Sequence, residues 1–186
     1  MIETKSDQES QAEAPPRCSF ARELAAQLRC GGQPTENDFD QHMPEDLRSL
    51  ASRHWTPLHV VGRAIRWLEG AGVRTVVDIG SGAGKFCVAG ALAGKSTFTG
   101  LEQRPRLVAS ARRLARHFAV NGRVQFIEGV FGETAVPVAD AYYFFNPFGE
   151  NLLGSGEHVD DDVILGPDRF RRDLAAATAF LKALTP

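Results

Sequence analysis

The residue types that could do chemistry gather at the ends of apolar runs. The first place is residues 75–86, Thr-Val-Val-Asp-Ile-Gly-Ser-Gly-Ala-Gly-Lys-Phe, where Gly80, Gly82 and Gly84 follow Asp78 at every second position. The apolar residues before the glycines are typical of a central parallel strand covered on both faces. Because glycine has no Cβ, a small molecule can approach the bare backbone of such a turn. The stretch therefore predicts a buried strand, a ligand-binding turn and the start of a helix.

The spacing of the glycines separates the ligand classes. A dinucleotide fingerprint needs glycines at its first, third and sixth positions, but the sixth position from Gly80 is Lys85. A phosphate-binding loop needs Ser or Thr after Gly-Lys, and Phe86 stands there. The later Gly-Lys-Ser at residues 94–96 is preceded by Gly90, which is one residue too close. Both nucleotide motifs are thus disfavoured.

Two further polar positions follow apolar runs. Glu102 ends the run 96–102, about 20 residues after the glycine turn, where a carboxylate can accept hydrogen bonds from both hydroxyls of a ribose. Asn146 follows the apolar run 140–145. Ligands of open α/β sheets bind outside the carboxyl ends of the strands. We therefore expect Glu102, Asn146 and the glycine turn to lie at one edge of a sheet.

The segment Asp78-Ile79-Gly80-Ser81-Gly82-Ala83-Gly84 resembles the first motif of the class I S-adenosylmethionine-dependent methyltransferases. The resemblance implies an α/β fold with a doubly wound, mainly parallel sheet in the order 3-2-1-4, and S-adenosyl-L-methionine as cofactor. It implies a cofactor site made of Asp78, Gly80, Ser81, Gly82, Gly84, Glu102, Gln103, Glu128, Gly129, Val130 and Asn146. Val130 stands where the family often has an Asp that binds the adenine amine, which leaves Glu128 or Glu133 as the alternative partner.

Asn146, Pro147 and Phe148 occupy the position of the fourth motif of that family. They are similar, but not identical, to the Asn-Pro-Pro-aromatic signature of amino-group methyltransferases and to the Asn-Asn-Phe segment of non-SET histone-lysine methyltransferases. The resemblance implies a catalytic role, in which the amide oxygen orients an amine and Phe148 encloses the substrate. The alternative is a turn without a catalytic part, because Asn-Pro is common in turns.

Composition limits the other classes of function. The net charge of -2 and the 24% of charged residues argue against a general nucleic-acid binder, although local basic patches stay open. The three cysteines have no metal-binding spacing, so no metal site is expected. No apolar run is long enough to span a membrane, and no secretory signal is evident. These features predict a cytoplasmic protein without a membrane partner.

The chain divides into three regions by composition. Residues 1–16 are polar and predict a disordered tail, residues 17–70 predict a helical extension, and residues 71–186 predict the Rossmann-like domain. The sheet of the resembled family continues with three more strands after the last predicted helix. We therefore expect the domain to be incomplete at its C-terminus, or a partner to complete the sheet.

Three further segments carry less specific signals. Trp55 is expected to be a core anchor and His54 a surface residue, with a lid over the cofactor as the alternative. The arginines around the predicted helix after Pro105 are expected on a solvated face: Arg104, Arg106, Arg112, Arg113, Arg116 and Arg123. Residues 149–166 are expected to form a polar loop that either covers the substrate or is disordered.

The sequence thus predicts a methyltransferase that acts on an amino group of a protein or small molecule of unknown identity. One alternative is a methyltransferase-like module without catalytic activity that works as an interaction domain. The other is a nucleotide-dependent oxidoreductase.

Overall fold

The computed structural model describes residues 16–32 and 34–184. The predicted tail lies outside the described residues except for Pro16, which begins the first helix. Within the described residues, five helices precede the sheet: α1 (Pro16–Arg29), α2 (Glu36–Asp40), α3 (Glu45–Arg48), α4 (Ala51–His54) and α5 (Leu58–Gly70). α2 begins with a capping box, in which Thr35 and Asp38 bond to each other's backbone N–H groups.

The sheet has the strand order that the family resemblance implies. Its strands are β1 (Thr75–Ile79), β2 (Thr97–Glu102), β3 (Val124–Glu128) and β4 (Ala141–Phe144). All pairs are parallel, and the order is β3-β2-β1-β4. Ile79 lies opposite both Leu101 and Phe144, so the last residues of neighbouring strands end at the same level. The polar residues that follow these strands are therefore brought to one edge.

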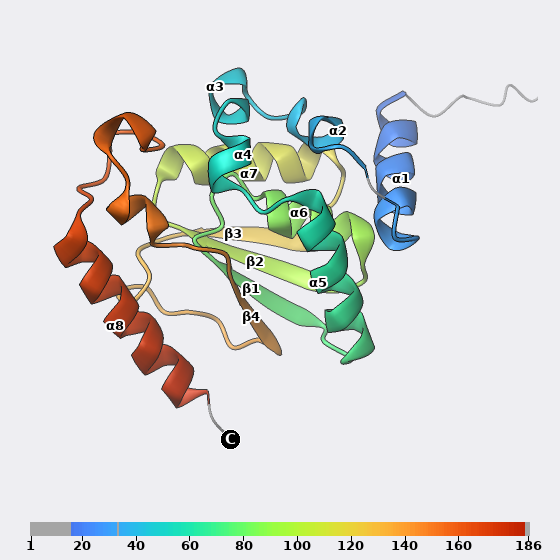
Figure 1. The fold of residues 1–186 in the computed structure, drawn as a ribbon. Helices are drawn as coiled ribbons and strands as arrows, with labels where there is room; N and C mark the ends of the chain where they lie inside the picture. The colour runs from blue at the N-terminus through green and yellow to red at the C-terminus, as the bar shows by residue number, and fades with distance from the viewer. Residues whose placement is uncertain (1–15, 33, 185–186) are drawn as a thin grey trace, which may run out of the picture.

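Helices cover the two faces of the sheet unequally (Figure 1). On one face lie α5, α6 (Lys85–Ala93) and α7 (Pro105–His117), and on the other lies α8 (Pro167–Ala183). Adjacent residues of β4 show the division, because side chains alternate along a strand. Tyr143 stacks on Phe86 of α6, whereas Tyr142 contacts Phe180 of α8.

The N-terminal helices share the main core with the sheet. Leu24 and Leu28 of α1, Phe39 of α2 and Leu47 of α3 are buried in the same cluster as Val76. All nine residues of α6 are buried, since α1 and α5 pack over it. Full burial of each such aliphatic or aromatic side chain contributes about 1.5–3 kcal/mol. The helical extension is thus held to the sheet by a continuous apolar interior.

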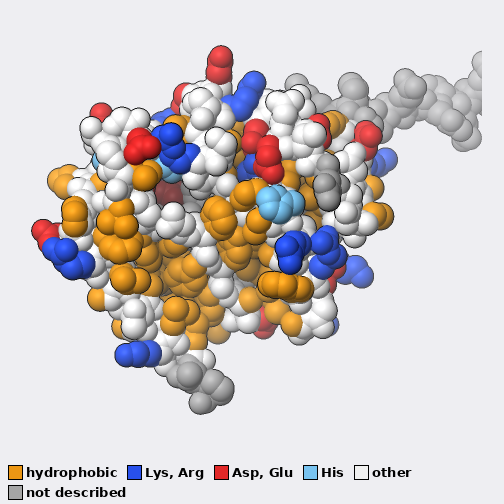
Figure 2. Space-filling model, in the orientation of Figure 1, with side chains coloured by type: hydrophobic (Ala, Val, Ile, Leu, Met, Phe, Trp, Pro, Cys, Tyr) orange, Lys and Arg blue, Asp and Glu red, His pale blue; other side chains and the backbone are white. Residues whose placement is uncertain are grey.

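Large apolar side chains remain exposed on α8 and on the segments before and after β4. They include Val138, Ile164, Leu152, Leu181 and Leu174. Figure 2 shows hydrophobic side chains gathered on the side of the molecule where β4 and α8 lie. Among the described residues β4 pairs only with β1, so its other edge is unpaired.

The connections after β3 and β4 carry the remaining features. Residues 129–140 contain no helix. Two short 3-10 helices, η1 (Gly149–Leu152) and η2 (Ser155–Glu157), follow β4. None of the described helices is long and apolar enough to cross a membrane.

Candidate functional site

The glycine turn has the backbone conformation that its sequence predicts. Gly80 and Gly82 have φ values of 73° and 54°, in the left-handed region that favours glycine. The N–H groups of Gly80 and Ser81 both donate to the carbonyl oxygen of Leu101, at 2.9 and 3.0 Å. A Cβ on Gly80 would lie 2.7 Å from the Cβ of Pro147, and one on Gly82 would overlap the ring of Trp55. Both glycines are therefore also required by close packing.

Glu102 connects the end of β2 to the glycine turn. Its Oε2 atom accepts from the Gly82 N–H at 3.0 Å, and its Oε1 atom accepts from the Arg104 N–H at 2.9 Å. The side chain is buried, and burial raises the pKa of its carboxyl although the two N–H groups oppose the shift. Each carboxylate oxygen can accept a further hydrogen bond. Glu102 can therefore serve a ligand while it holds the turn in place.

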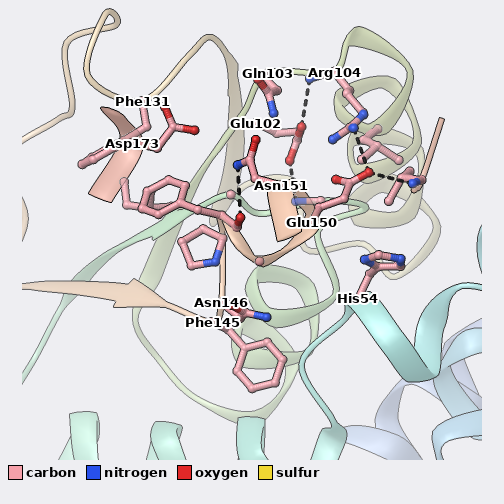
Figure 3. A pocket seen from close by; sticks show the side chains of 18 of the residues that line it. His54, Glu102, Gln103, Arg104, Phe131, Phe145, Asn146, Glu150, Asn151 and Asp173 are labelled. Carbon is pink, nitrogen blue, oxygen red and sulfur yellow. Dashed lines mark hydrogen bonds and ion pairs between the residues drawn. The ribbon is translucent and has the colours of Figure 1, made fainter. Parts of the chain in front are cut away.

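A cavity of about 200 Å³ lies at the carboxyl ends of the strands (Figure 3). The structure brings most of the predicted site residues to its wall. Those that line it are Gly80, Gly82, Glu102, Gln103, Gly129, Val130, Asn146, Pro147 and Phe148. Aromatic rings from Trp55, Phe131 and Phe145 complete the apolar part of the wall.

The other predicted site residues lie elsewhere. Asp78 and Ser81 line a separate small hollow beneath the turn. Gly84 is packed where a Cβ would meet Phe126, and Glu128 lines neither space and is exposed. Glu128 is therefore not placed to bind a ligand in either space.

The hollow beneath the turn contains several buried polar groups. The Cys87 thiol donates to Asp78 at 3.5 Å, and burial raises the pKa of Asp78 to about 7. The Ser81 Oγ atom is buried without a hydrogen-bond partner. Lys85 also lines the hollow and is buried between two carboxylates, with Nζ 2.6 Å from both Glu36 and Asp40 of α2. This ion cluster fixes α2 beside the start of α6.

Asn146 begins a tight turn against the glycine turn. Its φ of 48° is uncommon for a residue other than glycine, although asparagine tolerates it better than most. Its carbonyl accepts from the Gly149 N–H at 3.1 Å, and its side chain occupies the space where a Cβ of Gly149 would be. Pro147 packs on Gly80. The segment is thus a structural turn and also part of the cavity wall.

Arg104 is a site residue that the sequence pattern missed. We expected it on a solvated face, but this prediction is wrong because the segment 149–160 folds back over it. Its Nη2 atom lies 2.9 Å from Glu150 and its Nε atom 2.6 Å from Asp160, and only 3% of the residue is exposed. Glu150 also accepts from the Val159 N–H at 2.7 Å. The acidic loop is therefore ordered by ion pairs beside the cavity.

Three other arginines expected on that solvated face also bond to the protein, and Arg106 does so through ion pairs with Asp46 and Asp160. Arg112 donates to the carbonyl oxygen of Phe126 at 2.8 Å, and Arg123 donates to that of Gly94 at 2.8 Å. Both side chains tie neighbouring elements together. Arg112, Arg113 and Arg116 are all exposed, so neither charge nor position on the helix indicated that Arg112 would bond to the Phe126 carbonyl.

The segment before α5 forms another wall of the cavity. Trp55 is buried as predicted and covers Gly82, so packing and covering of the turn are combined in one residue. His54 is half-buried rather than on the surface, because η2 packs against it. Its Nε2 atom is 3.1 Å from the carbonyl oxygen of Glu157, and both Trp55 and His54 line the cavity.

The last helix contributes charged side chains that no sequence motif indicated. Asp173 is buried and lines the cavity, with its Oδ2 atom 3.4 Å from Nε of Arg169. Arg169 also donates to the side-chain oxygen of Gln103 at 2.5 Å. Figure 3 shows Asp173 beside Phe131 at the side of the cavity away from His54. Within residues 16–32 and 34–184, no group of three or more potential ligand side chains could hold a metal ion.

Comparison with known proteins returned matches among solved structures alone. No protein-family model matches the sequence, and no curated protein matches it. An RNA methyltransferase from Salinibacter ruber, in complex with S-adenosyl-L-homocysteine, is 30% identical over 52% of this chain and 63% of its own, with a TM-score of 0.44. A SAM-dependent methyltransferase from Thiobacillus denitrificans, with the same ligand, is 24% identical over 56% of this chain and 44% of its own, with a TM-score of 0.41.

An O-methyltransferase from Bacillus cereus, in complex with SAH, is 14% identical and covers 88% of this chain and 64% of its own, with a TM-score of 0.46. The chain spans less than two thirds of the length of each of these three structures. The chain has an α/β fold with the sheet order predicted from the sequence, and the solved structures similar to it include S-adenosylmethionine-dependent methyltransferases.

Proposed function

We propose that the chain binds S-adenosyl-L-methionine in this cavity and transfers its methyl group to an amino group of a protein or small molecule. The observation that carries the proposal is the position of Glu102. Its buried carboxylate lies on the cavity wall, bonded to the N–H of Gly82, with Asn146 on the same wall. A ribose-binding acid, a glycine turn and an amide are thereby within one cavity.

The polar groups of the site fit the parts of this cofactor. Glu102 has lone pairs for the ribose hydroxyls, and Gln103 is its neighbour on the wall. Val130 and Phe131 offer apolar contact to the adenine ring. Ser81, whose Oγ atom has no partner, and Asp78 line the adjoining hollow, which shares Gly80 and Trp55 with the cavity, and we assign them to the amino-acid part. When bound, the cofactor supplies a methyl group that is activated by its positively charged sulfur.

The protein's own contribution is then mainly positioning. Holding a nucleophile in line with the methyl group can be worth about 7–11 kcal/mol. The side-chain oxygen or backbone carbonyl of Asn146 would orient the lone pair of the acceptor nitrogen. Phe145 and Phe148 would enclose the acceptor and exclude water. Asn146, Pro147 and Phe148 are therefore the residues we assign to the catalytic wall.

Calorimetry with S-adenosyl-L-methionine and S-adenosyl-L-homocysteine tests the cofactor assignment, with NAD as a matched negative ligand. We expect saturable binding of the first two and none of NAD. A folded protein that binds neither sulfur compound would refute the proposal, and binding of NAD alone would favour the oxidoreductase alternative. A screen with cofactor labelled in the methyl group, against protein and small-molecule amines, tests the acceptor class.

One observation favours the non-catalytic alternative. Trp55 and Pro147 lie directly on Gly82 and Gly80, so the turn is closed by protein side chains. If the turn served packing alone, neither ligand would bind, and replacing Trp55 by alanine would not create binding. If the turn is a ligand site, Trp55→Ala should change the affinity for S-adenosyl-L-homocysteine.

A further inference from the structure

His54 is a titratable side chain on the cavity wall that belongs to none of the sequence motifs. It is the last residue of α4 and is half-buried. It lines the main cavity together with Gly82 and Asn146, and it also lines the hollow that contains Asp78. In Figure 3 it projects from the N-terminal segment beside Glu150. It therefore lies between the glycine turn and the acidic loop.

The contact with the acidic loop fixes the tautomer of the ring. The Nε2 atom is 3.1 Å from the backbone carbonyl oxygen of Glu157, and a carbonyl can only accept a hydrogen bond. Nε2 therefore carries the hydrogen. In the neutral ring Nδ1 then has the free lone pair, so it can accept a proton.

The surroundings keep the ring neutral near neutral pH. Burial lowers the pKa of His54 below its usual 6.5, and the charges of Arg53 and Arg104 act in the same direction. Glu150 and the hydrogen bond to the Glu157 carbonyl oppose this shift. The carboxylate of Glu150 is itself paired with Arg104 at 2.9 Å, and that of Glu157 lies 3.6 Å from Arg53. A neutral imidazole with one fixed N–H is the form that a general base requires.

We propose that His54 is the general base of the site and takes the proton of the acceptor group through Nδ1. This inference rests on the proposed function. The nitrogen of the acceptor uses its lone pair to form the bond to the methyl carbon. The bond from that carbon to sulfur breaks, and its electron pair stays on the sulfur, which becomes neutral. One proton of the acceptor nitrogen passes to Nδ1 of His54 and is later released to solvent.

The same base indicates which amino groups it can serve. A proton moves readily only to a group of comparable or higher basicity. An alkylamine such as a lysine side chain has a pKa of about 10.4 and would keep its proton in preference to this imidazole. An amino group attached to an aromatic ring is far less basic and releases the proton once it is methylated. The aromatic rings of Phe145 and Phe148 on the cavity wall also suit a flat ring. The acceptor class is thus an aromatic amine.

Nuclear magnetic resonance of protein with 15N-labelled histidine tests the inference without an acceptor. One probe is S-adenosyl-L-homocysteine. The other is the cofactor analogue in which an amino-bearing carbon replaces the methylated sulfur, so that a positive charge stands where the methyl group would be. In the free protein we expect the Nε2–H tautomer of His54 and a pKa below 6.5. The charged analogue should lower the pKa of His54 further than S-adenosyl-L-homocysteine does, since like charges repel.

His158 is the matched control, because its Nε2 atom is also bonded to a backbone carbonyl, that of Leu153 at 3.2 Å, but it does not line the cavity. His158 should respond equally to both ligands. His54→Gln keeps a donor for the Glu157 carbonyl and should bind S-adenosyl-L-homocysteine as tightly as the natural protein.

The outcomes separate the two proposals. If the protein binds neither ligand, the proposed function fails and the role of His54 fails with it. If both ligands bind but His54 shows the Nδ1–H tautomer, or titrates identically in the two complexes, the inference on His54 is wrong and the proposed function stands. A larger response of His54 than of His158 to the charged analogue supports the inference.

Discussion

Asp78→Asn should raise the free energy of unfolding, and the increase should be larger at high pH than at low pH. The Asp78 carboxyl is buried, and burial raises its pKa from 3.8 to about 7. An acid whose pKa is raised in the folded state binds its proton more tightly there than in the unfolded chain. Its charge therefore costs no folding free energy below pH 3.8, and the cost grows as the pH rises through 7. Asparagine has nearly the same shape but does not ionise.

The magnitude follows from the difference between the two pKa values. At about 1.4 kcal/mol per pH unit, ionisation of Asp78 costs about 4 kcal/mol at pH 8 and about 2 kcal/mol at pH 5. The effect of the substitution on the free energy of unfolding should thus differ by about 2–3 kcal/mol between these conditions. The amide oxygen of asparagine can still accept from the Cys87 thiol, so this hydrogen bond does not have to be lost in the variant.

Urea unfolding at pH 5 and pH 8, for the natural protein and the variant, measures this difference. Asp140→Asn is the control that should not respond to this change of pH. Asp140 accepts from the N–H groups of Arg74 and Thr75, which lower its pKa from 3.8, so its stabilising contribution is fully present at both pH 5 and pH 8 and is lost only at lower pH. If Asp78→Asn changes the free energy of unfolding equally at both pH values, burial does not hold a proton on Asp78 and the argument is refuted.

Three further substitutions test other parts of the site. Glu102→Ala should weaken binding of S-adenosyl-L-homocysteine by roughly 10-fold to 100-fold in calorimetry, the equivalent of one or two strong hydrogen bonds; unchanged affinity would contradict the ribose assignment. Asn146→Ala should lower the rate of methyl transfer to the acceptor found in the labelled-cofactor screen and leave cofactor affinity unaltered, whereas undiminished turnover would remove it from the catalytic wall. Arg104→Met leaves Glu150 and Asp160 without their buried partner and should cost about 3 kcal/mol in urea unfolding. Limited proteolysis of that variant should cut within residues 149–160 sooner than in the natural protein, and equal cleavage rates would mean that the ion pairs do not hold the loop.

The parts of the fold that follow from local sequence could be predicted. The alternation of glycines after an apolar run is enough to predict a strand and a turn, and the parallel sheet then brings Glu102 next to Gly82. The strand order came from the family resemblance, and the structure has that order. These features depend on residues close together in the chain or on the general geometry of parallel sheets, so they could be predicted from the sequence.

The residues that the sequence did not reveal depend on distant partners. Arg104 is buried because Glu150 and Asp160 return to it, 46 and 56 residues later in the chain. His54 is drawn into the site by Glu157, 103 residues away. A pattern of charges along one helix cannot say which arginine will meet a returning loop. Asp173 could not be predicted for the same reason, because only the packing of α8 brings it to the cavity.

The packing of Trp55 on Gly82 gives the protein a built-in optical reporter. The chain has two tryptophans, and they differ in environment: Trp55 is 8% exposed at the glycine turn, whereas Trp67 is 73% exposed on the outer side of α5. Any molecule that enters the turn must move or cover the indole of Trp55, but it leaves Trp67 in water. In a Trp67→Phe background, the fluorescence of one indole would therefore follow occupancy of the turn in real time, with no label attached.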